Sequence, residues 1–128
     1  MVSLPYRTQS QDFALCIAAL HHLSTRKRRL EALWEAGRTL RTGGLLLVFV
    51  WALEQPADSA LYRRELKYLS DNRQDVLVPW TTNEATQMRY YHLFRQGELE
   101  ELTLSTGLFE MVHKGYDQDN WYVCVRRL

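Results

Sequence analysis

The chain has 128 residues, of which 46% are hydrophobic, 24% charged and 12% aromatic, and its formal net charge is +1. This composition excludes wholesale disorder and fibrous repeats, and the length suits one domain with a real core. The nearly balanced charge excludes a strong overall attraction to nucleic acid or anionic membranes, so such contacts have to be local.

The two cysteines, Cys16 and Cys124, both lie inside apolar runs. We expect buried thiols in a reducing compartment, with a disulfide as the alternative, because the sequence does not give their separation. The start of the chain carries no apolar signal segment, and the apolar run at 45–53 is too short to span a bilayer. The expectation is a soluble protein of the cytoplasm, with the nucleus as a second compartment and no membrane contact.

The first third of the chain predicts a strand, a helix and a second strand. Residues 13–20 form an apolar run whose length suits a strand buried on both faces, with a helix segment as the alternative. A Ser-Thr pair at 24–25 offers a helix N-cap, and the glycine pair at 43–44 is expected to end that helix. Residues 45–51 are apolar throughout and predict a second covered strand, parallel to the first.

Four basic residues at 26–29 crowd the first turn of the predicted helix. We interpret them as a solvated face, with a local phosphate-binding patch as the alternative.

Residues 54–87 interrupt this pattern, and we interpret them as an active-site insertion of weak structure. Leucines at 61, 66 and 69 predict a short helix within it. Residues 89–94 are strand-like, and a short helix that Gly107 stops is expected after them. The segments 109–116 and 121–127 predict an antiparallel hairpin.

These elements predict an α/β fold with two parallel strands, a helical connection and a C-terminal antiparallel hairpin. Ligands of such sheets bind beyond the carboxyl ends of the strands. His21 and His22 follow the first strand, and Trp51 and Glu54 come at the end of the second. A site is therefore expected beside these four residues.

Several ordered motifs then carry a resemblance. The sequence reads Leu-Pro-Tyr-Arg at 4–7, Ile-Ala-Ala-Leu-His-His-Leu-Ser-Thr at 17–25, Val-Trp-Ala-Leu-Glu-Gln at 50–55 and Arg-Tyr-Tyr-His at 89–92. It resembles the class I S-adenosylmethionine-dependent methyltransferases, and most narrowly the eukaryotic tRNA wobble-uridine methyltransferases. That group, which includes a domain joined to AlkB-like dioxygenases, methylates 5-carboxymethyluridine in the anticodon.

The resemblance implies a partial Rossmann-like sheet, with residues 1–128 as the C-terminal portion of the methyltransferase domain. The family's glycine-rich cofactor turn and its acidic ribose-binding residue have no counterpart in this sequence. We therefore expect the isolated chain to bind S-adenosylmethionine weakly or not at all and to be inactive. The alternative is a non-catalytic paralogue or a protein- or RNA-interaction module.

Site residues follow from the resemblance. The cofactor S-adenosylmethionine would contact Leu4, Pro5, Ala19 and His21. A carboxylate substrate is already ionised, so the site needs no strong general base, only groups that orient it and offset its charge. Arginine and histidine suit this role because both donate hydrogen bonds.

His21 or His22 is expected to line the methyl-transfer pocket, with a structural histidine as the alternative. His92 and Arg95 would bind the carboxymethyl group or the wobble nucleotide. The alternative is that they are surface residues at the end of a strand, without a role in binding. Glu98 would orient Arg95 or cap the short helix.

The substrate side would include Arg7, Trp51 and Tyr91, with aromatic core packing as the alternative for the tryptophan. No metal site is expected. The implied partners are the tRNA anticodon loop and a small zinc-binding activator subunit.

Overall fold

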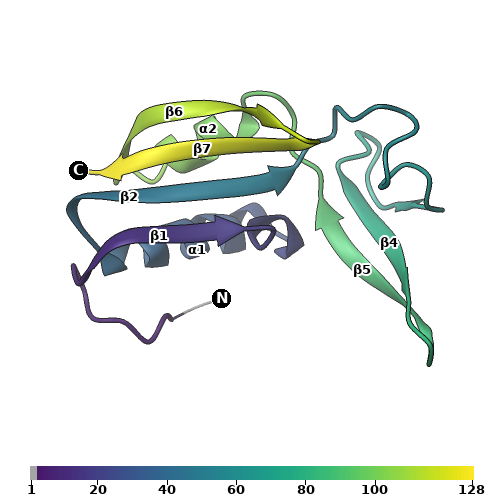
Figure 1. The fold of residues 1–128 in the computed structure, drawn as a ribbon, viewed down its shortest axis with the longest axis horizontal. Helices are drawn as coiled ribbons and strands as arrows, with labels where there is room; N and C mark the ends of the chain where they lie inside the picture. Colours follow the sequence, from purple (N-terminus) through teal and green to yellow (C-terminus); the bar gives the residue numbers. More distant parts are fainter. Residues whose placement is uncertain (1–2) are drawn as a thin grey trace.

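The computed structural model describes residues 3–128 as two sheets, a larger one with two helices and a smaller one beyond its end (Figure 1). The larger sheet has the order β1-β2-β7-β6, and the smaller one has the order β3-β4-β5. The larger sheet comprises β1 (Gln11–Ile17), β2 (Leu40–Trp51), β6 (Phe109–Asp117) and β7 (Asn120–Arg127). The predicted α/β class is confirmed.

Strand β1 pairs in parallel with β2, and helix α1 (Arg26–Thr39) connects them, as predicted. Strand β7 pairs antiparallel with β2 and with β6, so the predicted C-terminal hairpin extends the same sheet. Its turn contains Gln118 and Asp119, both with positive φ (45° and 70°), as a two-residue hairpin turn requires.

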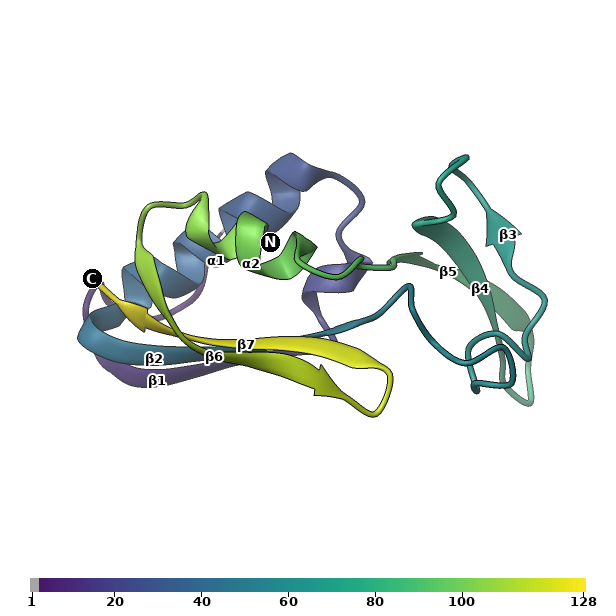
Figure 2. The same ribbon diagram turned by 90° about the horizontal axis from the view of Figure 1, so that it is seen from above.

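Only one face of the larger sheet is covered, and α1 and α2 (Glu98–Leu104) lie on it (Figure 2). The helix-facing residues Leu46, Val48 and Val50 of β2 are fully buried. The expectation that β1 is buried on both faces is wrong, because no element among residues 3–128 packs over its other face. The side chains of Phe13 and Leu15 are accordingly exposed.

Helix α1 begins as predicted, because the Thr25 hydroxyl accepts from the Arg28 N–H (3.1 Å). It does not end at the glycine pair, since β2 starts directly at Leu40. Gly43 (φ +84°) and Gly44 instead accompany an irregularity in the β1–β2 register. A Cβ on Gly44 would lie 3.1 Å from the backbone oxygen of Asp12, so close packing explains this glycine.

The segment 54–87 is more regular than predicted. It contains β3 (Lys67–Tyr68) and β4 (Asp75–Thr81), and β4 pairs antiparallel with β5 (Thr86–His92). Leu61 lies in a turn and Leu66 in irregular structure rather than in the predicted helix, and both pack onto this sheet. The tertiary contacts of a second small core therefore decide the local structure.

The cysteines are free thiols. Cys16 packs towards the helices, and Cys124 belongs to the opposite face, two strands away. None of the helices described in residues 3–128 has the length and hydropathy that crossing a membrane requires.

Candidate functional site at the carboxyl ends of the strands

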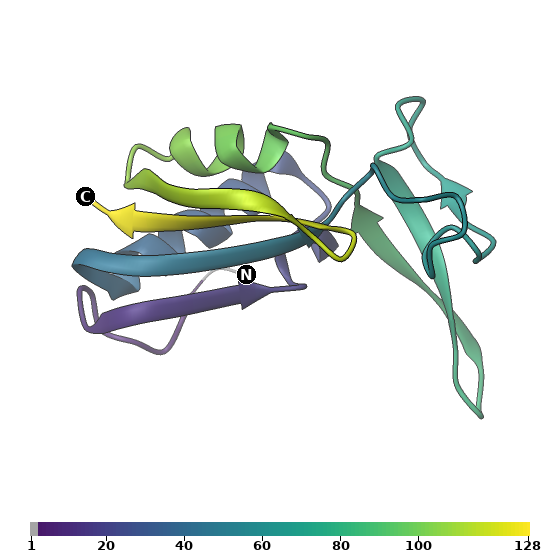
Figure 3. The same ribbon diagram turned by 45° about the horizontal axis from the view of Figure 1, so that its top comes forward.

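The predicted histidine pair lies in a single helical turn, Leu20–His22, just beyond the carboxyl end of β1 (Figure 3). Ala18, which leads into it, has φ +55°, a conformation that costs a non-glycine residue energy. The N–H of Ala18 donates to the carbonyl oxygen of Phe49 (3.1 Å), which fixes the turn against β2. Both histidines are thereby placed beside β5.

His21 is a buried residue that holds the end of β2. Its side chain is 1% exposed, and its Nδ1 accepts a hydrogen bond from the Trp51 N–H (2.9 Å). Burial, and then the neighbouring His22, lower the pKa of His21 to about 3. The ring is therefore neutral at physiological pH and positions Trp51.

His22 has the opposite character. It is exposed, and its Nδ1 lies 3.1 Å from the carbonyl oxygen of Tyr90, which requires a proton on Nδ1. Within residues 3–128 its Nε2 has no hydrogen-bond partner. This nitrogen is available to a ligand, and its orientation is fixed by the backbone.

Four rings from three segments form one cluster. Tyr91 stacks on Trp51 with centroids 4.2 Å apart and a 14° angle between the planes. The Tyr91 ring lies 4.9 Å from His21 and 4.3 Å from His22. The structure thus brings four predicted site residues together. Tyr91, which is 3% exposed, lies at the centre of the cluster and contacts the other three rings.

His92 is buried in a polar network below this cluster. Its Nδ1 lies 2.9 Å from an Asp75 carboxylate oxygen, and its Nε2 lies 2.6 Å from a Glu98 oxygen. Burial alone would raise the pKa of both carboxyls, but their hydrogen bonds from Tyr90, His92 and other donors outweigh it and lower both pKa values. Both nitrogens of His92 are engaged, unlike those of His22.

Arg95 is exposed, and the structure does not show Glu98 holding its guanidinium. The Glu98 carboxylate accepts from the Arg95 backbone N–H (3.1 Å) and from the Gln74 amide (2.5 Å). It also makes no hydrogen bond that caps α2. Its observed contacts fix the loop before α2.

Leu4, Pro5 and Arg7 lie in the segment before β1, which runs back along β1 and α1 (Figure 1). The Arg38 guanidinium near the end of α1 donates to the carbonyl oxygens of Leu4 and Tyr6 (3.2 and 2.9 Å). Leu4 and Tyr6 line a hollow of about 390 Å³ together with residues of β1 that include Phe13 and Leu15. Of the predicted cofactor residues, Ala19 and His21 adjoin the ring cluster, and Leu4 lies beside β1 and α1.

Further contacts at the site come from Glu54, which was predicted beside it, and from Gln74 and Asp75, which were not predicted. Glu54 accepts from the Trp121 indole (3.1 Å) and the Gln96 N–H (2.8 Å), so it ties the end of β2 to two later segments. Asp75 and Gln74 meet His92 and Glu98 only through the pairing of β4 with β5. A partner 17 residues away leaves no local pattern.

The basic run at the start of α1 does not form one patch. Arg26 pairs with Glu101 (3.8 Å), and Lys27 pairs with Glu31 (3.8 Å). Arg29 is buried and donates to the Leu23 carbonyl oxygen (2.7 Å). Arg26, Lys27 and Arg28 are exposed, as predicted for a solvated face, whereas the burial of Arg29 departs from that prediction.

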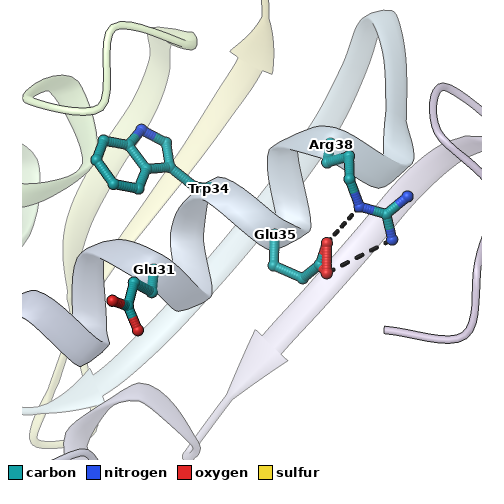
Figure 4. Close-up of a pocket in the computed structure, with 4 residues that line it drawn as sticks. All are labelled: Glu31, Trp34, Glu35 and Arg38. Atoms are coloured by element: carbon teal, nitrogen blue, oxygen red, sulfur yellow. Dashed lines mark hydrogen bonds and ion pairs between the residues drawn. The ribbon is translucent and has the colours of Figure 1, made fainter. Parts of the chain in front are cut away.

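A hollow of about 470 Å³ lies on α1, away from the histidines, and is lined by Glu31, Trp34, Glu35 and Arg38 (Figure 4). Glu35 and Arg38 point towards each other and pair. Arg38 and the Leu4 N–H lower the pKa of Glu35. Glu35 and Arg38 thus hold the start of the chain against α1 through their hydrogen bonds to Leu4. Across residues 3–128 no cluster of three or more histidine, cysteine or carboxylate side chains could hold a metal ion.

Comparison with known proteins identifies the relatives. A family model described as a methyltransferase domain matches residues 1–48. A tRNA (carboxymethyluridine(34)-5-O)-methyltransferase of Schizosaccharomyces pombe is 40% identical over 97% of this chain, and its Xenopus tropicalis counterpart, alkbh8, is 31% identical over 99%. The chain is a homologue of the tRNA carboxymethyluridine(34) methyltransferases.

The fold agrees with this homology. A SAM-dependent methyltransferase from Methanosarcina mazei superposes with a TM-score of 0.71 over 98% of this chain at 22% identity. A Pyrococcus horikoshii protein superposes with a TM-score of 0.74 over 98% of the chain at 10% identity. The chain spans 60% of the S. pombe relative, 28% of the X. tropicalis one and 63% and 58% of these two structures.

Proposed function

We propose that this chain acts in methyl transfer from S-adenosylmethionine to the carboxylate of 5-carboxymethyluridine at the wobble position of tRNA. The observation that carries the proposal is the 40% identity to the S. pombe methyltransferase over 97% of the chain. That length includes the segments that form the cluster of His22, Trp51 and Tyr91 at the carboxyl ends of the strands.

The proposed reaction forms a bond between a carboxylate oxygen and the methyl carbon, while the carbon–sulfur bond breaks and sulfur keeps the electron pair. S-adenosylmethionine supplies the electrophilic methyl group. No proton has to move, because the carboxylate is ionised near pH 7. Such a site needs a fixed donor for the carboxylate, and the free Nε2 of His22, when protonated, matches that need.

The described residues provide only part of a binding site for S-adenosylmethionine. Ala19 and His22 lie at the end of β1, where ligands of such sheets bind, whereas Leu4 lies beside β1 and its carbonyl oxygen accepts from Arg38. The six glycines, at 37, 43, 44, 97, 107 and 115, form no glycine-rich turn after a strand. We therefore assign no step through the cofactor to these residues.

A second candidate follows from that poor fit: a non-catalytic RNA-interaction module of the same homologous group. It would bind the anticodon loop without transferring a methyl group. In either case the proposal places the protein in the cytoplasm, with the nucleus as a second compartment. It also includes the small zinc-binding activator subunit, which co-expression followed by gel filtration would test.

The deciding experiment incubates the purified chain, with and without the activator, with tRNA carrying 5-carboxymethyluridine and methyl-labelled S-adenosylmethionine. We expect an alkali-labile methyl ester at position 34. Retention of tRNA without any ester would support the interaction module, and loss of both activities would contradict both candidates. Calorimetric titration of the chain with S-adenosylmethionine tests cofactor binding directly.

The role of His22 has its own test. We predict that His22→Gln lowers kcat for ester formation by about tenfold or more, because the ring donor that the Tyr90 carbonyl oxygen orients is lost. His113→Gln is the matched control, since His113 is exposed on β6 and contacts Tyr122 (2.9 Å). Equal rates for the two variants would contradict the assignment.

A further inference from the structure

The segment that follows β2 carries an arginine–tryptophan cluster outside the ring cluster just described. The guanidinium carbon of Arg64 lies 4.4 Å from the centroid of the Trp80 ring, and that of Arg89 lies 4.5 Å from the same ring. Arg64 comes from the turns after β2, Trp80 from β4 and Arg89 from β5. Three segments thus converge on one indole.

The two arginines have no carboxylate partner. Among residues 3–128, neither Arg64 nor Arg89 forms an ion pair, although eight such pairs occur elsewhere. Arg64 makes one long contact, from Nη1 to the Pro79 carbonyl oxygen (3.5 Å). Stacking on Trp80 orients the planar groups and leaves most of their N–H donors unused. The cluster is therefore a preorganised pair of cations.

A surface hollow of about 470 Å³ adjoins the cluster and is lined by Arg64, Glu65, Pro79, Trp80 and Thr81. Glu65, which is exposed, is the acidic residue among them. A planar guanidinium suits phosphate, to which it donates two parallel hydrogen bonds. It also offers a flat surface on which an unpaired base can stack.

The cluster is continuous with the candidate site. Arg89 and Tyr91 are two residues apart on β5 and face the same side of the small sheet, so they lie about 7 Å apart along the strand. The Trp80 indole and the Arg89 and Arg64 guanidiniums oppose the rise that burial causes in the pKa of Tyr91. A ligand bound beside Tyr91 and His22 would extend onto Arg89 and Arg64.

We propose that Arg64, Trp80 and Arg89 bind the phosphodiester backbone of single-stranded RNA next to the nucleotide held at His22 and Tyr91. This inference rests on the proposed function, because it takes the tRNA anticodon loop as the RNA. It assigns local RNA binding to a chain whose net charge of +1 excludes a strong overall attraction. The contacts are to the backbone, so they position the RNA without reading its sequence.

The test measures the affinity of the full chain for a fluorescent anticodon stem-loop RNA without cofactor, at several salt concentrations. We expect Arg64→Gln with Arg89→Gln to weaken binding on the order of tenfold and to flatten the salt dependence, because two phosphate contacts are lost. Arg63→Gln with Lys67→Gln is the matched control, because both residues are exposed and the two substitutions remove the same total charge from the same part of the protein. The control should change affinity less than about twofold, as expected of cations without a phosphate contact.

A second double variant separates geometry from charge. Arg64→Lys with Arg89→Lys keeps both charges but loses the planar stack, so we expect an affinity between that of the unsubstituted chain and that of the glutamine variant. Thermal unfolding of each variant confirms that folded proteins are compared.

Equal affinities for the glutamine variant and its control would overturn the inference. So would the absence of RNA binding by the unsubstituted chain, which would favour an acidic protein partner for this surface. A chain that binds RNA through the cluster but forms no methyl ester would contradict the proposed methyl transfer alone. A chain that forms the ester while the glutamine variant binds normally would contradict this inference alone.

Discussion

The two faces of the four-stranded sheet are made by the same strands, yet they differ in burial. On the face that α1 and α2 cover, Leu46 and Val48 of β2 are fully buried. On the other face, Phe13, Leu15 and Ile17 of β1 remain 50, 62 and 53% exposed. Both faces of β1 and of residues 45–51 of β2 are apolar, so the composition of these strands does not explain the difference.

The difference shows that an apolar strand sequence indicates which side chains could be buried, but not which of them are buried in the folded protein. Side chains alternate between faces with a period of two, and an entirely apolar strand places hydrophobic groups on both. Here the helices cover one face, while Phe49 on the other is half-buried and stacks on Tyr122 of β7 (ring centroids 5.0 Å apart). Burial free energy is therefore concentrated on the helix side.

The largest predicted effect tests this asymmetry directly. Leu46→Ala, on the covered face, should lower the free energy of unfolding by about 2–5 kcal/mol, because it leaves a cavity in the core. Leu47→Ala, one residue along and half-buried on the other face, should cost on the order of 1 kcal/mol. Urea unfolding of both variants measures the contrast, and equal losses would contradict it.

A smaller effect concerns His21, at the end of the covered face. Its pKa of about 3 lies below the ordinary value of 6.5, so protons bind the unfolded chain preferentially as the pH falls. The neutral His21 ring therefore costs no stability well above pH 6.5. The free energy of unfolding should fall by about 2 kcal/mol between pH 6.5 and 4.5. Denaturant unfolding at each pH measures this loss.

His21→Asn is the informative variant, because an amide oxygen can accept from the Trp51 N–H without titrating. It should flatten stability over that pH range, whereas His113→Gln should not. The carboxyls of Asp75 and Glu98, whose pKa values are lowered, lose their contributions only at lower pH. An unchanged slope in His21→Asn would place the titrating group elsewhere.

The smallest predicted effect on stability lies on the uncovered face. Leu15→Thr places a β-branched side chain, which suits a strand, on an edge strand and removes little buried area, so the free energy of unfolding should change by less than about 1 kcal/mol. The solubility of the protein should rise, because an apolar edge strand favours association. Light scattering at increasing concentration measures it, with Ala14→Thr on the helix-facing side as the destabilising comparison.

Much of the fold followed from local sequence signals. The cap at Thr25, the parallel pairing of β1 with β2, the helix that precedes Gly107 and the C-terminal hairpin were all predicted. Each depends on neighbouring residues or on short connections. The predictions that failed, a helix near Leu61 and a helix end at Gly43, concern segments whose structure depends on distant contacts.

The candidate site divides in the same way. The sequence placed both histidines and Trp51 at strand ends, but it did not separate their roles. The difference between His21 and His22 comes from two hydrogen bonds, to the Trp51 N–H and to the Tyr90 carbonyl oxygen. The second involves a residue 68 positions away.

By itself, the sequence determined the class of fold, the order of the main elements and the homology, because these depend on local patterns and ordered motifs. The tertiary structure alone decided which face of the sheet is covered, which histidine is free, and that Arg64 and Arg89 meet on Trp80. Burial and hydrogen bonding between distant segments set these features, and such contacts leave no periodic signal along the chain.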